Sequence, residues 1–261
     1  MRYSLLAGGK RIRPVLVLKF CQALCGSMEP ALDYACGVEM LHTYSLIHDD
    51  HPSMDDDDYR RGKLTNHKVF GDGMAILAGD ALLNYAFETA VKAFVLEPED
   101  SLTIGNAIRV LGEKAGIYGM LGGQVIDVKE TGHAVSKDVL DTIYELKTGA
   151  LIEAAMMIGA ILGGASQEEV KTVERIASLV GLAFQVQDDI LDVISTQEEL
   201  GKPIHSDEKN EKTTYVTLLG IDDAKKVVEE KSEEAISLLQ TLPNENPYLE
   251  ELLIELIHRK K

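Results

Sequence analysis

The sequence has few of the features that membrane-bound or exported proteins require. No stretch of about 18 residues, the length needed to cross a bilayer as a helix, is free of charged side chains. The apolar run Ala150 to Ala165 is too short for a span and contains Glu153. Met1 leads directly into Arg2 and not into the apolar segment of a signal peptide. We therefore expect no membrane span and a cytoplasmic location.

Cysteine is also scarce, and its pattern does not indicate disulfides or a zinc site. The chain has three cysteines, an odd number, at Cys21, Cys25 and Cys36. Cys21 and Cys25 are four residues apart within an apolar helical pattern, where cysteine acts as a small buried hydrophobic residue. A zinc site would need more ligands, at loop spacing.

Positive charge is in deficit. The chain has 26 Lys and Arg against 43 Asp and Glu, which gives a net charge of -17. This balance argues against a general nucleic-acid-binding protein, because phosphate backbones are bound by clustered basic side chains. An acidic protein that binds a phosphorylated ligand needs a local basic cluster, a metal ion, or both. The 45% hydrophobic content is that of an ordinary globular protein and excludes disorder for most of the chain.

Strand patterns are missing as well, because alternation with a period of two is nowhere sustained. Helical periodicity dominates and predicts an all-α fold, a bundle of about ten helices in a single domain over residues 1–261. The segment 148–162 is almost wholly apolar and should form a central, buried helix. Residues 195–212 are polar and should form a surface loop. The expected helices are 15–24, 31–47, 74–95, 100–118, 120–129, 136–144, 148–162, 166–193, 222–239 and 247–259.

A first acidic cluster follows the apolar segment Val38 to Ile47. It comprises Asp49, Asp50 and the run Asp55 to Asp58. Carboxylates at a helix C-terminus repel one another and oppose the helix dipole, so a cation would stabilise them. Mg²⁺ typically binds one or two carboxylates together with substrate phosphates and water. For Asp56 to Asp58 the alternative is a solvated acidic surface.

A second acidic cluster, Asp188, Asp189 and Asp192, interrupts a helix that otherwise has a buried, apolar pattern. Asp188 and Asp192 are four residues apart and therefore share one helical face. The interruption favours a metal-binding role over a solvated surface. Neither acidic cluster has the spacing of a calcium-binding EF-hand loop.

Basic residues lie close to both clusters in sequence, and a Gly8-Gly9 pair allows close backbone approach to a ligand at the start of the chain. Each basic residue alone is typical of a protein surface. Together with two acidic clusters they suit a pair of diphosphate substrates, one held through metal and one held by bases directly. The set comprises Lys10, Arg11, Arg13, Arg60, Arg61, Lys147, Lys202 and Lys212.

These motifs resemble the trans-prenyltransferase (polyprenyl synthase) family. The resemblance extends over essentially the whole chain and is carried by residues 8–14, 46–62, 78–83, 122–124, 147–151 and 184–192. It implies an all-α bundle around a central cavity, usually as a homodimer. It also implies Mg²⁺-dependent, head-to-tail condensation of isopentenyl diphosphate with an allylic diphosphate.

The resemblance assigns roles by position. Three Mg²⁺ ions, with Mn²⁺ as the alternative, would be held by Asp49, Asp55, Asp188 and Asp192. The allylic diphosphate would contact Arg60, Lys147, Thr148, Gln185, Lys202 and Lys212. Isopentenyl diphosphate would be held without metal by Lys10, Arg13, His42 and Arg61. The catalytic residues among these would be Asp49, Asp55, Arg60, Lys147, Asp188 and Lys202.

Product length is expected to depend on Tyr44 and Ser45, just before the first acidic cluster. At about 1.5 Å rise per residue, Tyr44 lies some 7 to 8 Å from Asp49 along a helix. A bulky ring there would form a floor under the growing chain. Tyr44 and the four residues between Asp50 and Asp55 resemble bacterial-type farnesyl diphosphate synthases, which predicts a C15 product.

Three alternatives remain at this point: a geranylgeranyl diphosphate synthase, a class I terpene cyclase, and a non-catalytic prenyltransferase subunit. A cyclase would have Asn or Asp, Ser or Thr, and Glu in its second metal motif. A non-catalytic subunit would tend to lose its acidic motifs, and both are intact here.

The chain departs from the family at His51, where an apolar residue is commoner, and at Gly8, which family members precede with an initial helix. We therefore expect that an N-terminal helix is missing.

Overall fold

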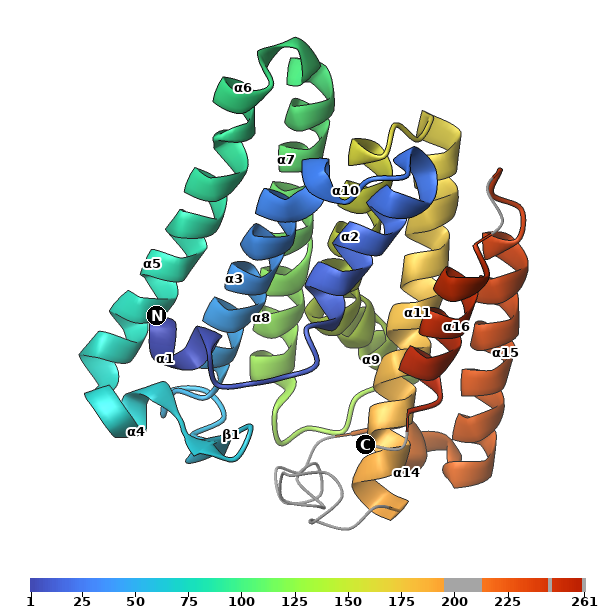
Figure 1. Ribbon diagram of the computed structural model, residues 1–261. Coiled ribbons are helices and arrows are strands. Elements are labelled where there is room, and N and C mark those ends of the chain that lie inside the picture. The colour runs from blue at the N-terminus through green and yellow to red at the C-terminus, as the bar shows by residue number, and fades with distance from the viewer. Residues whose placement is uncertain (195–212, 244–245, 260–261) are drawn as a thin grey trace.

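The computed structural model of the chain describes residues 1–194, 213–243 and 246–259 (Figure 1). Within these residues ten helices have seven or more residues, which confirms the expected bundle. They are α2 (Ile12–Cys25), α3 (Leu32–Asp49), α5 (Asp72–Val91), α7 (Ser101–Ala115), α8 (Met120–Glu130), α9 (Lys137–Ile143), α10 (Ala150–Leu162), α11 (Gln167–Ile194), α15 (Ile221–Leu239) and α16 (Pro247–Ile257). Shorter helices are α1 (Arg2–Leu5), α4 (Asn66–Phe70), α6 (Ala93–Leu96), α14 (Tyr215–Leu219), and the 3-10 turns Glu29–Ala31 and Pro98–Asp100.

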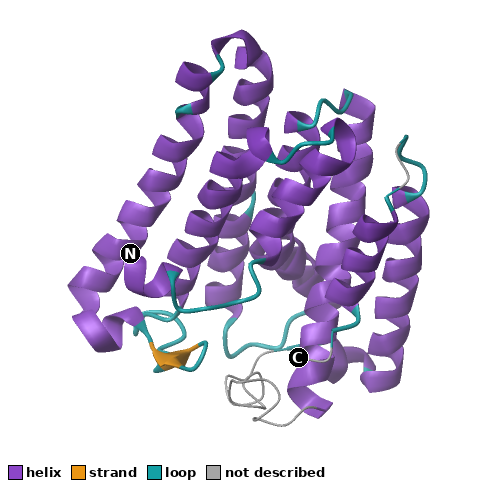
Figure 2. Ribbon diagram, in the orientation of Figure 1, coloured by secondary structure: helices purple, strands orange, loops and turns teal. Residues whose placement is uncertain are grey.

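The prediction that the chain has no strand is wrong at one place. Strands β1 (Tyr59–Arg60) and β2 (Lys63–Leu64) pair antiparallel and form a small hairpin at one end of the bundle (Figure 2). Arg61 and Gly62 form its turn with positive φ angles of 54° and 73°. Two positive φ angles are what a two-residue hairpin turn requires. Strands of two residues are too short to show an alternating pattern in the sequence.

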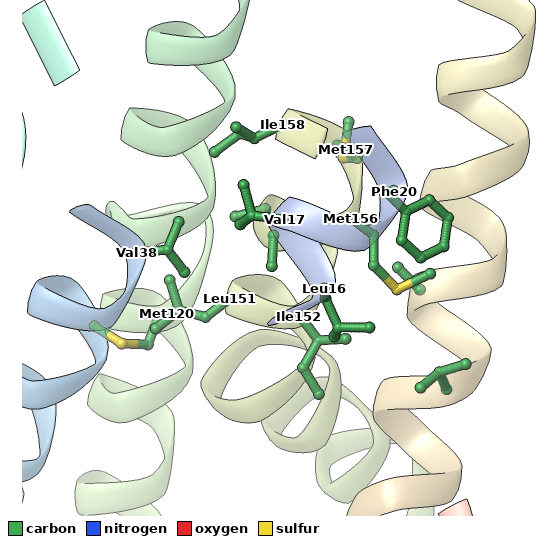
Figure 3. Packing of buried hydrophobic residues seen from close by; sticks show 14 of the residues in the cluster. Leu16, Val17, Phe20, Val38, Met120, Leu151, Ile152, Met156, Met157 and Ile158 are labelled. Carbon is green, nitrogen blue, oxygen red and sulfur yellow. The ribbon is translucent and has the colours of Figure 1, made fainter. Parts of the chain in front are cut away.

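Helix α10 is the centre of the bundle, as its apolar sequence predicts. Every residue from Ala150 to Ala160 is buried. The helix packs against α2, α7 and α11, and Figure 3 shows Leu16 and Phe20 of α2 together with Met156 of α10. Gly159 allows the close approach of α2, because a Cβ atom there would lie 2.4 Å from the carbonyl oxygen of Val17.

The junction before α10 differs from the prediction. The sequence predicts one helix that ends near Tyr144 and another that begins at Thr148. In the structure the π-helix η3 (Tyr144–Gly149) connects α9 directly to α10. Single π-turns inside longer helices are rare and are frequently found at functional sites. Lys147 and Thr148 both lie within this turn.

Both acidic clusters lie at the same end of the bundle. The C-terminal ends of α3 and α11, which carry them, are on the side of the hairpin in Figures 1 and 2. In the described part of the chain no helix is long and apolar enough to cross a membrane. The cytoplasmic location, the single domain and the missing N-terminal helix stay predictions. Residues 195–212, expected as a loop, lie outside the described residues.

Candidate active site

The end of α3 lies against α8 and η3, where two side chains contact the Asp49 carboxylate. Gln124 Nε2 donates a hydrogen bond to Asp49 Oδ1 at 2.6 Å. Lys147 Nζ lies 3.3 Å from the same oxygen and 2.7 Å from Asp127 Oδ2. Burial disfavours the Lys147 ammonium, but the carboxylates of Asp49 and Asp127 outweigh burial and raise the pKa of Lys147. Lys147 is therefore a fixed positive charge beside the first acidic cluster.

Asp50 and Arg60 form a second ion pair at this end of α3. Asp50 is buried, and Arg60 Nε donates to its Oδ1 at 2.8 Å. Burial opposes the Arg60 charge, yet the attraction of Asp50 prevails and raises the pKa of Arg60. Arg60 also contacts Asp57 at 3.3 Å, and Asp58 pairs with Lys68 at 2.7 Å. The acidic run after Asp55 is thus partly neutralised by neighbouring bases.

A basic cluster, made of Arg13, His42 and Arg61, brings together residues that are far apart in the sequence. Arg13 Nη2 lies 3.5 Å from the carbonyl oxygen of Thr148, and Arg13 Nε is buried without a hydrogen-bond partner. Burial lowers the pKa of Arg13 to about 10. The pKa of His42 falls well below its usual value, first because of burial and then because Arg13 and Arg61 repel an imidazolium. His42 is therefore neutral at physiological pH.

The glycine pair before α2 makes room for Arg61. A Cβ atom on Gly9 would lie 2.5 Å from the Arg61 guanidinium carbon, and Arg61 Nη1 donates to the carbonyl oxygen of Gly8. Both glycines have positive φ angles, of 99° and 108°. The backbone conformation therefore favours glycine at both positions, because side chains rarely adopt these φ angles. Lys10 lies exposed in the same loop.

The second acidic cluster lies near the C-terminal end of α11. Arg259 Nη2 pairs with Asp188 Oδ1 at 3.0 Å. Asp192 is buried, and its Oδ1 has no hydrogen-bond partner. Gln185, one turn before Asp188, accepts a hydrogen bond of 2.9 Å from Thr148 Oγ1. This bond joins α11 to the π-turn that carries Lys147.

The acidic side chains fit a hard divalent cation. Carboxylate oxygens are the ligands that Mg²⁺ prefers, and Mg²⁺ usually takes few of them together with substrate phosphates. An orphaned buried oxygen such as Asp192 Oδ1 is stabilised by a cation that reaches it. Across residues 1–194, 213–243 and 246–259, no three acidic, His or Cys side chains form a complete metal cage on their own. A Mg²⁺ ion that is bound together with phosphate needs fewer protein ligands than such a cage.

A cavity of about 120 Å³ lies between η3, α11 and the segment before α14. Its walls include three residues expected to contact the allylic diphosphate, namely Lys147, Thr148 and Gln185. Asp127 and Asp189 line it as well. Lys202 and Lys212, expected at the same site, lie outside the described residues. Arg60, the fourth described residue of that predicted set, does not line this cavity and lies with Asp50 in a separate pocket.

The expected floor residues lie inside the bundle on α3. The Tyr44 side chain is buried, and its hydroxyl has no hydrogen-bond partner. Its ring lies edge-on to His48, with ring centres 5.8 Å apart. Ser45 Oγ donates to the carbonyl oxygen of His42 at 2.9 Å. Ser45 is therefore engaged with its own helix.

Four side chains that are not among the expected site residues also take part in this arrangement. Gln124 and Asp127 orient Asp49 and Lys147. A Gly-Gly-Gln sequence at 122–124 was the only signal for the first of them. Tyr144 and Asp189 form a further buried hydrogen bond of 2.7 Å beside the cavity.

Comparison with known proteins gives a consistent result. The family model described as polyprenyl synthetase matches residues 1–251. The chain is 50% identical over 241 residues to a chloroplastic geranylgeranyl pyrophosphate synthase of Capsicum annuum, with 92% of this chain and 65% of that protein covered. It is 47% identical over 227 residues to a farnesyl diphosphate synthase of Geobacillus stearothermophilus, with 86% and 75% covered. The chain thus spans about two thirds to three quarters of these relatives' length.

The same comparison extends to solved structures. A geranyltransferase of Helicobacter pylori, in complex with magnesium and isoprenyl diphosphate, superposes with a TM-score of 0.85 at 35% identity. The match covers 98% of this chain and 85% of that one. The likeness confirms the expected all-α fold.

Proposed function

This chain belongs to the polyprenyl synthetase family of prenyltransferases, and from that premise we propose that it is a farnesyl diphosphate synthase. It would condense isopentenyl diphosphate with dimethylallyl diphosphate and then with geranyl diphosphate. The observation that carries the proposal is the junction at η3. There Lys147 contacts Asp49 of the first acidic cluster, and Thr148 contacts both Arg13 and Gln185. The first acidic cluster and the basic residue Arg13 thus both contact η3, which supports one site for two diphosphates.

The basic cluster would bind isopentenyl diphosphate without metal. Arg13 and Arg61 are partly buried cations, and Lys10 lies exposed beside them. Arg13 Nε, buried and unpartnered, is a donor for a phosphate oxygen. Neutral His42 adds one donor and adds no charge. Guanidinium groups bind phosphate oxygens in pairs, which also fixes the ligand's orientation.

The allylic diphosphate would bind between the two acidic clusters with three Mg²⁺ ions. Asp49, Asp55, Asp188 and Asp192 would hold the metal. When bound, Mg²⁺ neutralises diphosphate charge and so makes diphosphate a better leaving group. Lys147 would add a fixed positive charge at the same place. Thr148 and Gln185 would orient the substrate.

The reaction would proceed by ionisation and addition. The allylic carbon–oxygen bond breaks, and its electron pair leaves with diphosphate. The double bond of isopentenyl diphosphate, held close to the allylic cation, forms the new carbon–carbon bond. A proton then passes from the adduct to the departed diphosphate. The apolar interior of the bundle would exclude the water that otherwise captures the cation.

Chain length is the finer part of the proposal. Tyr44 lies buried on α3 before Asp49, and a ring at that place supports a product of 15 carbons. The Geobacillus relative is named for this product. The Capsicum relative is named for the C20 product, so a geranylgeranyl diphosphate synthase is the second candidate.

The proposal is tested by incubating the purified chain with Mg²⁺, isopentenyl diphosphate and dimethylallyl diphosphate. Product alcohols are measured after dephosphorylation, with an EDTA-treated sample as the control. A C15 alcohol that disappears with EDTA is the expected result. A C20 alcohol would replace the proposed product by the second candidate, and no product at all would overturn the proposed activity.

A second copy of the chain is the proposed partner, in a homodimer. Large exposed apolar side chains are concentrated on α5 to α8, including Leu77, Val95, Tyr118 and Val125. Because α5 to α8 are neighbours in the bundle, these exposed apolar side chains support an interaction site there. Sedimentation should give twice the mass of one chain. Val125→Glu should shift the protein toward monomer, whereas Ile254→Glu, an exposed residue on α16, should not.

A further inference from the structure

Asp189 is the one residue of the second acidic cluster that is not among the proposed metal ligands. It lies between Asp188 and Asp192 in the chain, yet its side chain points into protein and is only 2% exposed. Its Oδ2 atom accepts two hydrogen bonds, from the Tyr144 hydroxyl at 2.7 Å and from the Tyr215 backbone N–H at 2.9 Å. One carboxylate oxygen of Asp189 is therefore engaged in hydrogen bonds within the protein.

The two donors belong to different elements of the site. Tyr144 is the first residue of the π-turn η3, which carries Lys147 and Thr148. Tyr215 is the first residue of α14, and Thr214 before it lines the site cavity. Asp189 on α11 is thus the point at which three elements that line this cavity are tied together.

The tyrosine rings strengthen this junction. Tyr144 and Tyr215 stack with ring centres 5.8 Å apart and an angle of 27° between their planes. Tyr215 is fully buried, and its hydroxyl contacts Asp141 and Lys137 of α9. The start of η3 therefore has Asp189 on one side and a stacked ring on another. A π-turn is a rare element, and these contacts hold its first residue from two sides.

We propose that Asp189 is a positioning residue for the allylic diphosphate and not a metal ligand. Through Tyr144 it holds η3 so that Lys147 and Thr148 face the cavity, and through the Tyr215 amide it fixes the cavity wall. This inference rests on the proposed function. It gives neighbouring carboxylates different tasks, since Asp192 has a free buried oxygen and Asp189 has two donors on one oxygen.

The two roles differ in what they require of the side chain. A metal ligand needs negative charge, whereas positioning needs an oxygen that accepts two hydrogen bonds. Asparagine supplies such an oxygen without the charge. Asp189→Asn should therefore keep the Mn²⁺ affinity of the wild type within about twofold, and Asp192→Asn should weaken it at least tenfold. Mn²⁺ binding is measured by electron paramagnetic resonance with inorganic diphosphate present.

Positioning is tested through Tyr144→Phe, which removes one of the two donors and leaves the ring in place. Loss of one hydrogen bond corresponds to about a tenfold change in an equilibrium constant. We expect the KM for the allylic diphosphate to rise about five- to tenfold, while the KM for isopentenyl diphosphate changes less than twofold. Asp189→Leu should raise the KM for the allylic diphosphate more than Asp189→Asn does.

Tyr34→Phe is the matched control. Tyr34 is another fully buried tyrosine on α3, and its hydroxyl donates to the carbonyl oxygen of Ile104 at 3.3 Å. It is not among the residues that line the cavity. Its substitution should lower thermal stability but leave both KM values unchanged. Equal effects of Tyr34→Phe and Tyr144→Phe on allylic KM would mean a merely structural role and would overturn the inference.

The inference also has a test that does not depend on turnover. Calorimetry with Mg²⁺ and inorganic diphosphate measures binding at the site directly. Tyr144→Phe should weaken this binding and Tyr34→Phe should not. If the wild type binds diphosphate but makes no prenyl product, the proposed function fails while the positioning role remains measurable. If Asp189→Asn loses Mn²⁺ binding as Asp192→Asn does, Asp189 is a metal ligand and the inference fails.

Discussion

The imidazole of His48 on α3 occupies the space that a side chain on residue 79 of α5 would need. A Cβ atom on Gly79 would lie 2.1 Å from His48 Nε2, far inside any real contact. The same nitrogen lies 3.1 Å from the carbonyl oxygen of Ile76, and the ring meets Tyr44 edge-on. The absence of a side chain at 79 therefore lets His48 support the ring that we propose as the chain-length floor.

Gly79→Ala should destabilise the protein and disturb this support. Overpacking of a tight site typically costs about 1 to 3 kcal/mol in the free energy of unfolding, because neighbours must leave their favoured positions. Gly73→Ala on the same helix is the control, since nothing lies within 4 Å of a Cβ there. That change should be neutral or stabilising by up to about 1 kcal/mol. Urea unfolding of both variants gives the comparison, and equal stabilities would contradict the packing argument.

Tyr44→Ala should lengthen the product. Removal of the ring opens space along α3 beneath Asp49, so the growing chain can continue beyond 15 carbons. Tyr44→Phe is the matched control, because it keeps the ring and removes a buried hydroxyl that has no partner. It should keep the C15 product and be at least as stable as the wild type, since an unpaired buried polar group is costly. An unchanged product distribution in Tyr44→Ala would refute the floor.

Much of the fold could be predicted because its helices are long and periodic. Helix α11 was expected at 166–193 and spans Gln167–Ile194, and α10 is buried as its composition predicts. Elements of two to five residues could not be predicted, because they are too short to show a helical or strand periodicity in the sequence. The π-turn at Tyr144–Gly149 escaped for a different reason. It lies within an otherwise helical stretch, and the contact of its first residue with Asp189 is a tertiary contact that no local pattern reveals.

Site residues could be predicted from the sequence only where the residue types themselves indicate the chemistry. Clusters of aspartate are visible in a sequence because they are unfavourable without a cation. Gln124 and Asp127 were missed because an amide and a carboxylate on an ordinary helix look like surface residues. Only the structure shows that they contact Asp49 and Lys147.

Stability should depend on pH through His42. Its pKa is lowered in the folded protein by burial and by Arg13 and Arg61, whereas in the unfolded chain it returns to about 6.5. Below that pH the unfolded state binds more protons, so the free energy of unfolding falls as pH drops from about 7 to 5.5. The loss at pH 5.5 from this residue should be about 1 kcal/mol.

His42→Gln isolates this contribution, because the variant lacks the titrating group. Its stability should fall about 1 kcal/mol less than that of the wild type over the same pH interval. His258→Gln, which replaces an exposed histidine, is the control and should follow the wild-type profile. Parallel profiles for His42→Gln and the wild type would contradict the prediction.

Asp127 should control how readily the first acidic cluster accepts a metal. Lys147 is shared between Asp127 at 2.7 Å and Asp49 at 3.3 Å, so Asp127 draws the ammonium away from Asp49. In Asp127→Asn the Lys147 ammonium has only Asp49 as its ion-pair partner in this pair of carboxylates. It therefore competes more strongly with a metal cation for the Asp49 carboxylate. The Mg²⁺ concentration for half-maximal activity should rise several-fold, and the Mn²⁺ affinity measured without turnover should fall in step. Asp138→Asn, which also removes one negative charge at an exposed position, should leave both unchanged. If the two variants shift the metal dependence equally, the effect is one of overall charge and Lys147 does not compete with the metal.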